Sequence, residues 1–495
     1  MLFDSIINKD YLYKLYLEFM LIKLLFIFVV CFLQVGSSEE ARPDIVLIIV
    51  DDLNDWVGCL EGHPDAHSPN IDALANNGML FTQAYCNIAH CRPSRLSMNH
   101  GIYPFKTGTY FNARYPREKK IKTPSIQQFF LEKGYRVVSG GKVFHGGSGK
   151  VGDVLLKRPK DPSAPILKSI SKLSGPPNDG YPLDVKDYQM GDYKVAKWAI
   201  KQWNTVTEKP LFMSIGFYRP HRPFQVPKHY FERFPLSSIR RPAEPIEGDD
   251  WDDLPIFSKK LARSLSARSM IDGMSYHEYM VKNDHWDSTI QAYHACVSFV
   301  DRQIGRLLKS LQENPRERET YIILVSDHGW HLGEKKHWSK CALWEQTTHI
   351  PFIVTGSSIK PSSICRQPVS LIDVYSSLVD LAGFKIPSWL DGQSIKPQLI
   401  DPSLSRPPVI CSYGAGNTAI RTERWRYIRY EDGSEELYDH DVDPNEWKNL
   451  AKKVDFRKIK DDLRKLIPEN QHSGLRVQAW FDQHQLGYLE EINQF

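Results

Sequence analysis

Four short apolar runs punctuate the chain, and polar residues follow each of them at once. The runs span residues 45–50, 135–139, 211–217 and 321–325. A run that is apolar at nearly every position is typical of a strand buried on both faces, as in a parallel sheet. The pattern therefore predicts a buried central sheet rather than a sheet with one face in water.

Segments with helical signals separate these runs. Residues 68–78 and 123–134 each open with a hydroxyl residue and a proline and close with a glycine, which is typical of helix starts and ends. Residues 290–311 carry apolar side chains at helical spacing and predict a long amphipathic helix, and residues 371–382 predict a shorter one. Strands that alternate with helices favour an α/β fold with a large central, mainly parallel sheet flanked by helices.

The pattern changes near residue 400. A proline-rich stretch, residues 402–408, is followed by strand-like alternation around a turn over residues 419–438, which predicts a small antiparallel sheet. We therefore expect a main domain over residues 38–400 and a small C-terminal α+β subdomain over residues 401–495.

Two stretches inside the main domain have little periodicity. They are residues 146–195 and 236–285, both rich in Pro, Lys and Asp. Long stretches without a clear period predict surface insertions rather than core elements.

An apolar run near the N-terminus indicates export. Residues 24–33 are an unbroken run of ten apolar residues, with Lys23 before it and small residues after it. This is typical of a signal peptide, here residues 1–37, and a run of this length is too short to span a bilayer. Met20 offers a more typical start than the first residue, and an uncleaved signal anchor is the alternative. We expect a secretory-pathway protein, lysosomal or secreted, with no stable membrane partner.

Composition and charge exclude one class of partner. The net charge is +4, with 41% hydrophobic and 25% charged residues, which are ordinary values for a soluble globular enzyme. So small and dispersed an excess of positive charge argues against nucleic acid as a partner. Eight cysteines permit disulfides in an exported chain, but their spacing does not determine the pairing.

Ionisable side chains follow all four apolar runs. They are Asp51, Asp52, Lys142, His145, His221, Asp327 and His328. In an open α/β sheet, ligands bind outside the carboxyl ends of the strands. We therefore expect these side chains to converge on one site, the alternative being ordinary loop chemistry at four separate places.

The acids among them suggest a metal. Asp51, Asp52 and Asp327 offer three carboxylates, and His328 adds one imidazole. Oxygen-rich ligand sets favour Ca²⁺ or Mg²⁺ over zinc. The alternative is that these acids cap helices or lie in surface loops.

The segment Cys91-Arg92-Pro93-Ser94-Arg95, with Gly101 after it, is the sharpest local signal. Proline suits a first helical turn and glycine a helix end, so Cys91 is expected at a helix N-terminus. Exposed N–H groups and the helix dipole favour a bound anion there. The alternative is a buried structural cysteine.

The same segment resembles the signature of sulfatases, Cys-x-Pro-Ser-Arg followed by a glycine, in which the cysteine is oxidised to formylglycine. Further similar motifs follow in the order that sulfatases use, and the resemblance runs from about residue 42 to residue 451. Within the family, the chain looks most similar to the iduronate-2-sulfatase group, which has an Asp-His pair at the position of Asp327-His328. The resemblance implies an alkaline-phosphatase-like fold.

The resemblance also implies roles by position. The residues implied to hold one Ca²⁺, together with the formylglycine made from Cys91, are Asp51, Asp52, Asp327 and His328. Those implied to surround the sulfate are Lys142, His145, His221 and Lys340. Arg95 would stabilise the aldehyde hydrate, His145 would act as a base, and His221 would protonate the leaving alcohol.

The function that the resemblance implies is hydrolysis of sulfate esters on a sulfated glycan, with the 2-sulfate of iduronate in heparan or dermatan sulfate as the expected target. A formylglycine-generating enzyme would act on the chain during maturation. Arg92 at the variable position and Asn99-His100 before Gly101 depart from the usual signature and bear on how efficiently Cys91 is converted. The alternatives are a sulfatase of another sulfated glycan, a phosphonate or phosphate monoester hydrolase of the same fold, and a non-catalytic protein that binds sulfated glycans.

Overall fold

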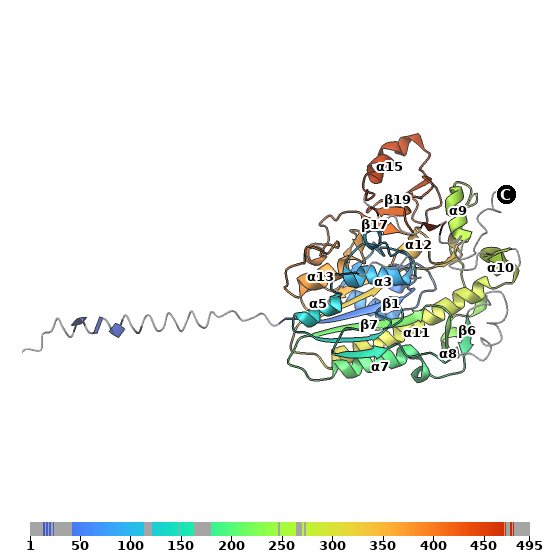
Figure 1. Cartoon of the computed structure of the whole chain (residues 1–495). Coiled ribbons are helices and arrows are strands. Elements are labelled where there is room, and N and C mark those ends of the chain that lie inside the picture. Colours follow the sequence, from blue (N-terminus) through green and yellow to red (C-terminus); the bar gives the residue numbers. More distant parts are fainter. Residues whose placement is uncertain are drawn as a thin grey trace, which may run out of the picture. The chain divides into compact units, whose positions relative to one another are not determined.

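The structure is a computed structural model (Figure 1), in which the chain divides into two compact units, Met1–Arg42 and Pro43–Phe495. The residues it describes are 42–112, 121–147, 149–162, 180–245, 248–263, 270–271, 274–469, and scattered positions at 13–23 and 471–479. The described positions from 13 to 23 are helical, and the apolar run at 24–33 lies outside the described residues. Within the described part of the chain, no helix has the length and apolar character needed to cross a membrane.

A sheet of eight strands lies at the centre of the second unit, in the order β15-β2-β14-β11-β1-β7-β4-β5. Its strands are β1 (Asp44–Asp51), β2 (Met79–Phe81), β4 (Arg136–Gly141), β5 (Val154–Lys157), β7 (Leu211–Pro220), β11 (Thr320–Ser326), β14 (Phe352–Thr355) and β15 (Ser363–Cys365). The pairings from β11 through β5 are parallel, whereas β14 is antiparallel to both β11 and β2. The predicted mainly parallel sheet is confirmed, and the four predicted strands are four neighbours in it.

Helices cover both faces of this sheet (Figure 1). Those of one face are α3 (Cys91–His100), α5 (Ile126–Glu132) and α13 (Asp373–Leu381), and those of the other are α2 (Pro69–Asn76), α7 (Gly191–Trp203) and α11 (Trp286–Glu313). Alternate residues of β1 enter two different cores: Leu47 packs with α5 and α13, and Ile48 packs with α7 and α11. Both sets of side chains leave water, and this explains why the strand is apolar at every position.

The predicted helix starts differ from the observed caps. α5 begins at Ile126, and the hydroxyl of Ser125, not of Thr123, accepts a hydrogen bond from the Gln128 N–H at 3.3 Å. Ser68 precedes α2 as predicted, but its hydroxyl donates to the Asp72 carboxylate at 3.0 Å instead of capping the helix. A nearby acid competes for the hydroxyl, and the local pattern alone does not reveal that competition.

A second, four-stranded antiparallel sheet follows the main sheet in sequence, as predicted. It contains β17 (Val409–Ser412), β18 (Thr418–Arg421), β19 (Trp425–Arg429) and β20 (Glu435–Asp439), and α15 (Arg457–Arg464) packs against β19. One side of this sheet has a small core of its own, which includes Ile420 and Leu437, while Tyr438 and Ile428 join the large core.

The shorter elements lie mostly in the connections. They are β3 (Ala84–Tyr85), β6 (Tyr181–Leu183), β8 (Gln225–Pro227), β9 (Met270–Ile271), β10 (Met274–Ser275), β12 (His331–Leu332), β13 (Trp338–Ser339), β16 (Val369–Ser370), α4 (Pro104–Thr107), α8 (Lys228–Phe231), α9 (Ile256–Arg263), α10 (Tyr276–Lys282), α12 (Glu345–Thr348), α14 (Lys396–Ile400), and 3₁₀ turns at Gly58–Leu60, Asp187–Gln189, Leu236–Ser238, Glu334–Lys336 and Val454–Phe456. The predicted surface insertions are corrected in two places. The second stretch, 236–285, buries Trp251 and Leu254 in one core and Tyr276 and Met280 in the other. In the first stretch, residues 154–157 form β5 at the edge of the main sheet. A strand of this length is too short for its period to stand out.

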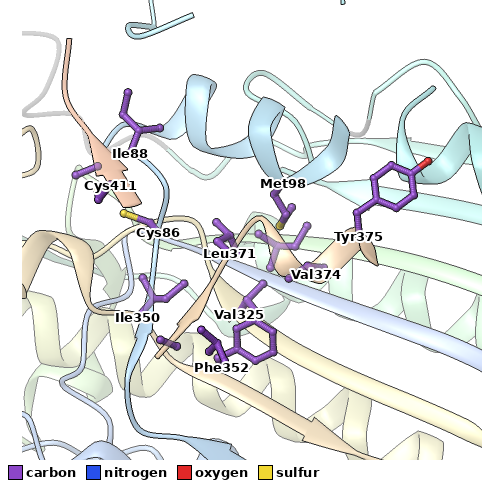
Figure 2. Packing of buried hydrophobic residues seen from close by; sticks show 14 of the residues in the cluster. Cys86, Ile88, Met98, Val325, Ile350, Phe352, Leu371, Val374, Tyr375 and Cys411 are labelled. Atoms are coloured by element: carbon purple, nitrogen blue, oxygen red, sulfur yellow. The ribbon is translucent and has the colours of Figure 1, made fainter. Parts of the chain in front are cut away.

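The core beneath α3 joins distant parts of the chain (Figure 2). Met98 of α3 packs with Val325 of β11, Leu371, and Val374 of α13, all of them buried. Cys86 lies beside Cys411 of β17, and burial together with a hydrogen bond to that thiol raises the Cys86 pKa. All seven cysteines in the described part of the chain are free thiols.

We expect Leu371→Ala to lower the free energy of unfolding by about 2–5 kcal/mol, because it leaves a cavity in a core that cannot fully collapse. Leu371 is 0% exposed, whereas Leu404, the control, is 44% exposed. Leu404→Ala should change stability by less than about 0.5 kcal/mol. Denaturant unfolding of both variants measures this, and equal losses would contradict the assigned core.

Candidate active site

The carboxyl ends of four parallel strands bring the expected polar residues together. Asp51 is the last residue of β1, and Asp327 directly follows β11, its parallel neighbour. Lys142 follows β4, while His221 follows β7. Asp52 has a φ of 60°, a left-handed conformation uncommon for a side chain other than glycine, and its N–H donates to the Asp327 carboxylate at 3.0 Å. The turn after β1 is thus held against the turn after β11.

Cys91 is the first residue of α3, and its thiol faces this group. The sulfur is fully buried, 2.9 Å from Lys340 Nζ and 3.3 Å from His328 Nε2. Asp52 Oδ1 lies 3.8 Å away. The structure therefore places Cys91 where the sequence predicted it, at a helix N-terminus and next to the acids.

Arg95 lies one helical turn after Cys91, so both side chains share one face of α3. Its fully buried guanidinium pairs with Asp51 at 3.1 Å and with Asp327 at 2.8 Å. It also donates to the Lys142 backbone carbonyl. These contacts make Arg95 a clamp between three strand ends, and its suggested contact with an aldehyde hydrate stays a prediction.

Each of the two lysines forms an ion pair with one of the two adjacent aspartates, Asp51 and Asp52. Lys142 pairs with Asp51, and Lys340 pairs with Asp52 Oδ1 at 2.9 Å. His145 lies on an exposed turn after β4 and hydrogen-bonds to the Cys91 thiol. It therefore lies at the entrance of the site rather than beneath it.

His221 is half-buried, and its ring orientation is determined by the backbone. Nδ1 lies 2.6 Å from the Arg222 carbonyl oxygen. Because a carbonyl only accepts, Nδ1 carries the proton and Nε2 faces the site, 3.9 Å from Asp52 Oδ2. All the residues proposed from the sequence for this site therefore lie around Cys91 or its carboxylate neighbours.

The electrostatics favour negative charge at the position of the Cys91 side chain. Burial alone would raise the pKa of the thiol, but Lys340, Lys142, His328 and the hydrogen bond from His145 together hold it well below its usual value. Positive charges and hydrogen bonds gathered around one buried atom are an environment that also stabilises an oxyanion or a bound anion.

The carboxylates next to it are compensated unequally. Burial raises the pKa of Asp327 to about 6, only partly offset by Arg95 and His328. Burial raises the pKa of Asp51 as well, but Lys142, His221 and Arg95 outweigh that effect and keep it below the usual range. Asp52 Oδ2 is buried and has no hydrogen-bond partner. A divalent cation would satisfy this oxygen and favour the ionised form of Asp327.

The geometry fits such a cation. Ligand atoms of Asp52, Cys91, Asp327 and His328 all lie within 4.8 Å of one another, and Asp51 and Asp52 form a second such group with His221. His328 Nδ1 bonds to the Gly329 carbonyl at 2.9 Å, which directs Nε2 toward the acids. Burial lowers the His328 pKa, but Asp327 and Cys91 outweigh it and raise it to about 9, so a metal ion would compete with that proton for Nε2.

Several residues that support the site were not predicted from the sequence. The Tyr293 hydroxyl of α11 donates to the Asp52 carbonyl at 2.9 Å and accepts from the Asn54 N–H at 3.0 Å. Ser94 donates to the Asp327 carbonyl at 2.6 Å. Tyr293 belongs to the apolar stripe of its helix, so its pattern suggests packing alone, whereas Ser94 lies within the Cys91 segment and could have been found there.

Comparison with known proteins identifies this arrangement. The sulfatase family model matches residues 43–384, which includes every strand end of the site. The chain belongs to the sulfatase family. A model described as N-sulphoglucosamine sulphohydrolase, C-terminal, matches residues 333–473. Members of the family use Ca²⁺ and formylglycine, and the cluster around Cys91 fits both.

Three relatives show how far this sulfatase resembles known ones. A sulfatase of Formosa agariphila is 33% identical over 453 residues, covering 88% of each chain. Human iduronate 2-sulfatase is 30% identical over 396 residues, covering 72% of this chain and 71% of its own. The solved structure of a 2-O GAG sulfatase superposes with a TM-score of 0.68 at 23% identity and covers 91% of this chain and 94% of its own, which confirms the fold.

We expect this sulfatase to bind one Ca²⁺ per chain and Asp52→Asn to lose it, because the change removes a ligand charge at an otherwise unpartnered oxygen. Sulfate release should fall by more than about a hundredfold. Changing a residue that only hydrogen-bonds to a metal ligand already lowers metal affinity or activity by about 10–100-fold. Elemental analysis and a sulfate assay measure both effects. The control is Asp441→Asn, a carboxylate whose side chain is 60% exposed. Stoichiometric zinc without calcium in the wild-type protein would overturn the assignment.

Proposed function

We propose that this sulfatase removes the 2-sulfate from iduronate, or from a closely similar uronic acid, at the end of a glycosaminoglycan chain. The observation that carries the proposal is the position of His328, which lies between Cys91 and the acids of the site. The iduronate-2-sulfatase group has an Asp-His pair at this point, and the identity to human iduronate 2-sulfatase supports the same reading.

The charges around Cys91 explain how a sulfate ester would be activated. A sulfate monoester is anionic and repels nucleophiles, so its oxygens need cationic neighbours. Lys340 and Lys142 supply two ammonium groups, paired with different acids of the cluster and both buried. A formylglycine at position 91 would supply a hydrated aldehyde as nucleophile, and a Ca²⁺ held by the acids would polarise the sulfate.

The two histidines divide the proton transfers. His145 reaches the side chain of residue 91 from the solvent side, so it can move a proton between that side chain and bulk water. His221 presents Nε2 to the site while its Nδ1 is held by a carbonyl. A protonated Nε2 in this orientation can donate to the oxygen of the leaving alcohol.

Maturation forms part of the same proposal. The core of the signature, Cys91, Pro93, Ser94 and Arg95, is what a formylglycine-generating enzyme would recognise during export through the secretory pathway, to the lysosome or the cell exterior. The apolar run at 24–33 supports entry into that pathway.

We expect Cys91→Ala to abolish sulfate release while leaving the melting temperature nearly unchanged, because alanine cannot be converted to the nucleophile. Cys59→Ala, at a half-buried thiol elsewhere, is the matched control and should remain active. The peptide containing residue 91 should weigh about 18 Da less than its unmodified form in wild-type protein. Undiminished turnover by purified Cys91→Ala protein would refute the mechanism.

A panel of substrates at mildly acid pH tests the specificity. Iduronate 2-sulfate disaccharide should have a kcat/KM far above those of glucosamine 6-sulfate, galactosamine 4-sulfate, an aryl sulfate and an aryl phosphonate monoester. One pocket contact that a substrate makes or lacks changes the ratio of kcat/KM between two substrates by about tenfold to several hundredfold. Faster turnover of any of the other sulfates would replace the proposed substrate but keep the sulfatase, whereas preference for the phosphonate would change the reaction class.

A further inference from the structure

Arg158 lies at the rim of the site, against the ring of Tyr218. It directly follows β5 and is half-buried. Its guanidinium carbon lies 4.1 Å from the centroid of the Tyr218 ring, a close cation–π contact. Within the part of the chain that the structure describes, Arg158 has no hydrogen bond and no ion pair, so its N–H donors remain available.

Tyr218 connects Arg158 to the groups around the sulfate position. Its ring packs on His221 at 4.6 Å between centroids, and Lys142 Nζ lies 5.2 Å from the same ring. The tyrosine itself is held by two hydrogen bonds, from its N–H to Asp192 and from its hydroxyl to the Arg222 carbonyl, both 2.8 Å. Arg158, His221 and Lys142 therefore all lie against the same tyrosine ring, which two hydrogen bonds hold in place.

Arg219, which also lies against this ring, and Arg95 inside the site are both paired. Arg219 is buried, lies 5.3 Å from the Tyr218 centroid, and pairs with Asp161 at 2.7 Å. Arg95 pairs with two acids inside the site. In contrast, Arg158 forms no ion pair with any residue that the structure describes. An arginine stacked on an aromatic ring keeps its planar fork oriented for a carboxylate, which it can bind through two parallel hydrogen bonds.

We propose that Arg158 forms a second anion subsite, which binds the carboxylate of the uronic acid while Cys91 and the lysines hold its 2-sulfate. The inference rests on the proposed function and adds the residue that selects a carboxylate-bearing sugar. A uronic acid 2-sulfate carries two anions on one ring, and one cationic cluster cannot reach both. Arg158 supplies the second cation at the edge of the sheet, outside the chemistry at Cys91.

The test compares two substrates with each variant. One is the iduronate 2-sulfate disaccharide, and the other is the same disaccharide with its carboxyl group reduced to an alcohol. Arg158→Gln should lower kcat/KM on the carboxylate substrate by about ten- to a hundredfold and on the reduced substrate by less than about threefold. The kcat/KM of Arg158→Lys on the carboxylate substrate should lie between those of the wild type and Arg158→Gln. A lysine ammonium keeps the positive charge but cannot form the two parallel hydrogen bonds of a guanidinium.

Lys157→Gln is the matched control, since it removes the same charge one residue earlier from an exposed side chain. It should affect both substrates by less than about threefold, which separates a local contact from long-range electrostatic steering. Melting temperatures of all variants show whether the fold is retained. Free iduronate, as an inhibitor of aryl sulfate hydrolysis, should also lose potency by about tenfold or more in Arg158→Gln.

The outcomes separate this inference from the function on which it rests. If the wild-type enzyme cleaves iduronate 2-sulfate and Arg158→Gln weakens both substrates equally, Arg158 is no carboxylate subsite, although the proposed function survives. If the wild-type enzyme prefers a sulfated sugar that has no carboxylate, and free iduronate does not inhibit it, the proposed function and the subsite both fail.

Discussion

The buried clamp between Arg95 and the acids at the ends of β1 and β11 is the interaction on which the rest of the site depends. Three carboxylates, those of Asp51, Asp52 and Asp327, are removed completely from water. Such burial is costly unless cationic partners and hydrogen bonds compensate it. Arg95 compensates two of them at once, and because it belongs to the same helix as Cys91, it also holds the reactive residue in register with the sheet.

The position of Cys91 follows from this balance of charge and packing. α3 rests on a core that draws on β11, α13 and the C-terminal sheet, so the helix cannot shift without disturbing several layers (Figure 2). The lysines then complete the compensation: Lys142 pairs with Asp51 and Lys340 with Asp52. The result is a rigid, preorganised group of charges, which is what stabilises an anionic transition state at low reorganisation cost.

The chemistry and the specificity of this sulfatase lie in different parts of the fold. The strand ends and α3 carry groups that would serve any sulfate ester, and one such scaffold supports many substrates. We expect selectivity to come from the rim, because connecting segments generally vary more than the elements they join. The edge strand β5 lies in such a connection, and Arg158, which follows it, packs on the Tyr218 ring beside His221.

The buried parallel sheet and the polar residues at its strand ends could be predicted from the amino-acid sequence, because both depend on local patterns. Near-continuous apolar runs indicate strands such as β1, and the Cys91 segment indicates a helix start. The packing of distant elements, by contrast, is what brings the Arg95 donors to Asp51 and Asp327, the Tyr293 hydroxyl to Asp52, and Arg158 to the Tyr218 ring. These contacts join residues up to 241 positions apart. They depend on which elements pack together and on how buried charges are shared, and no local period in the chain records either of these.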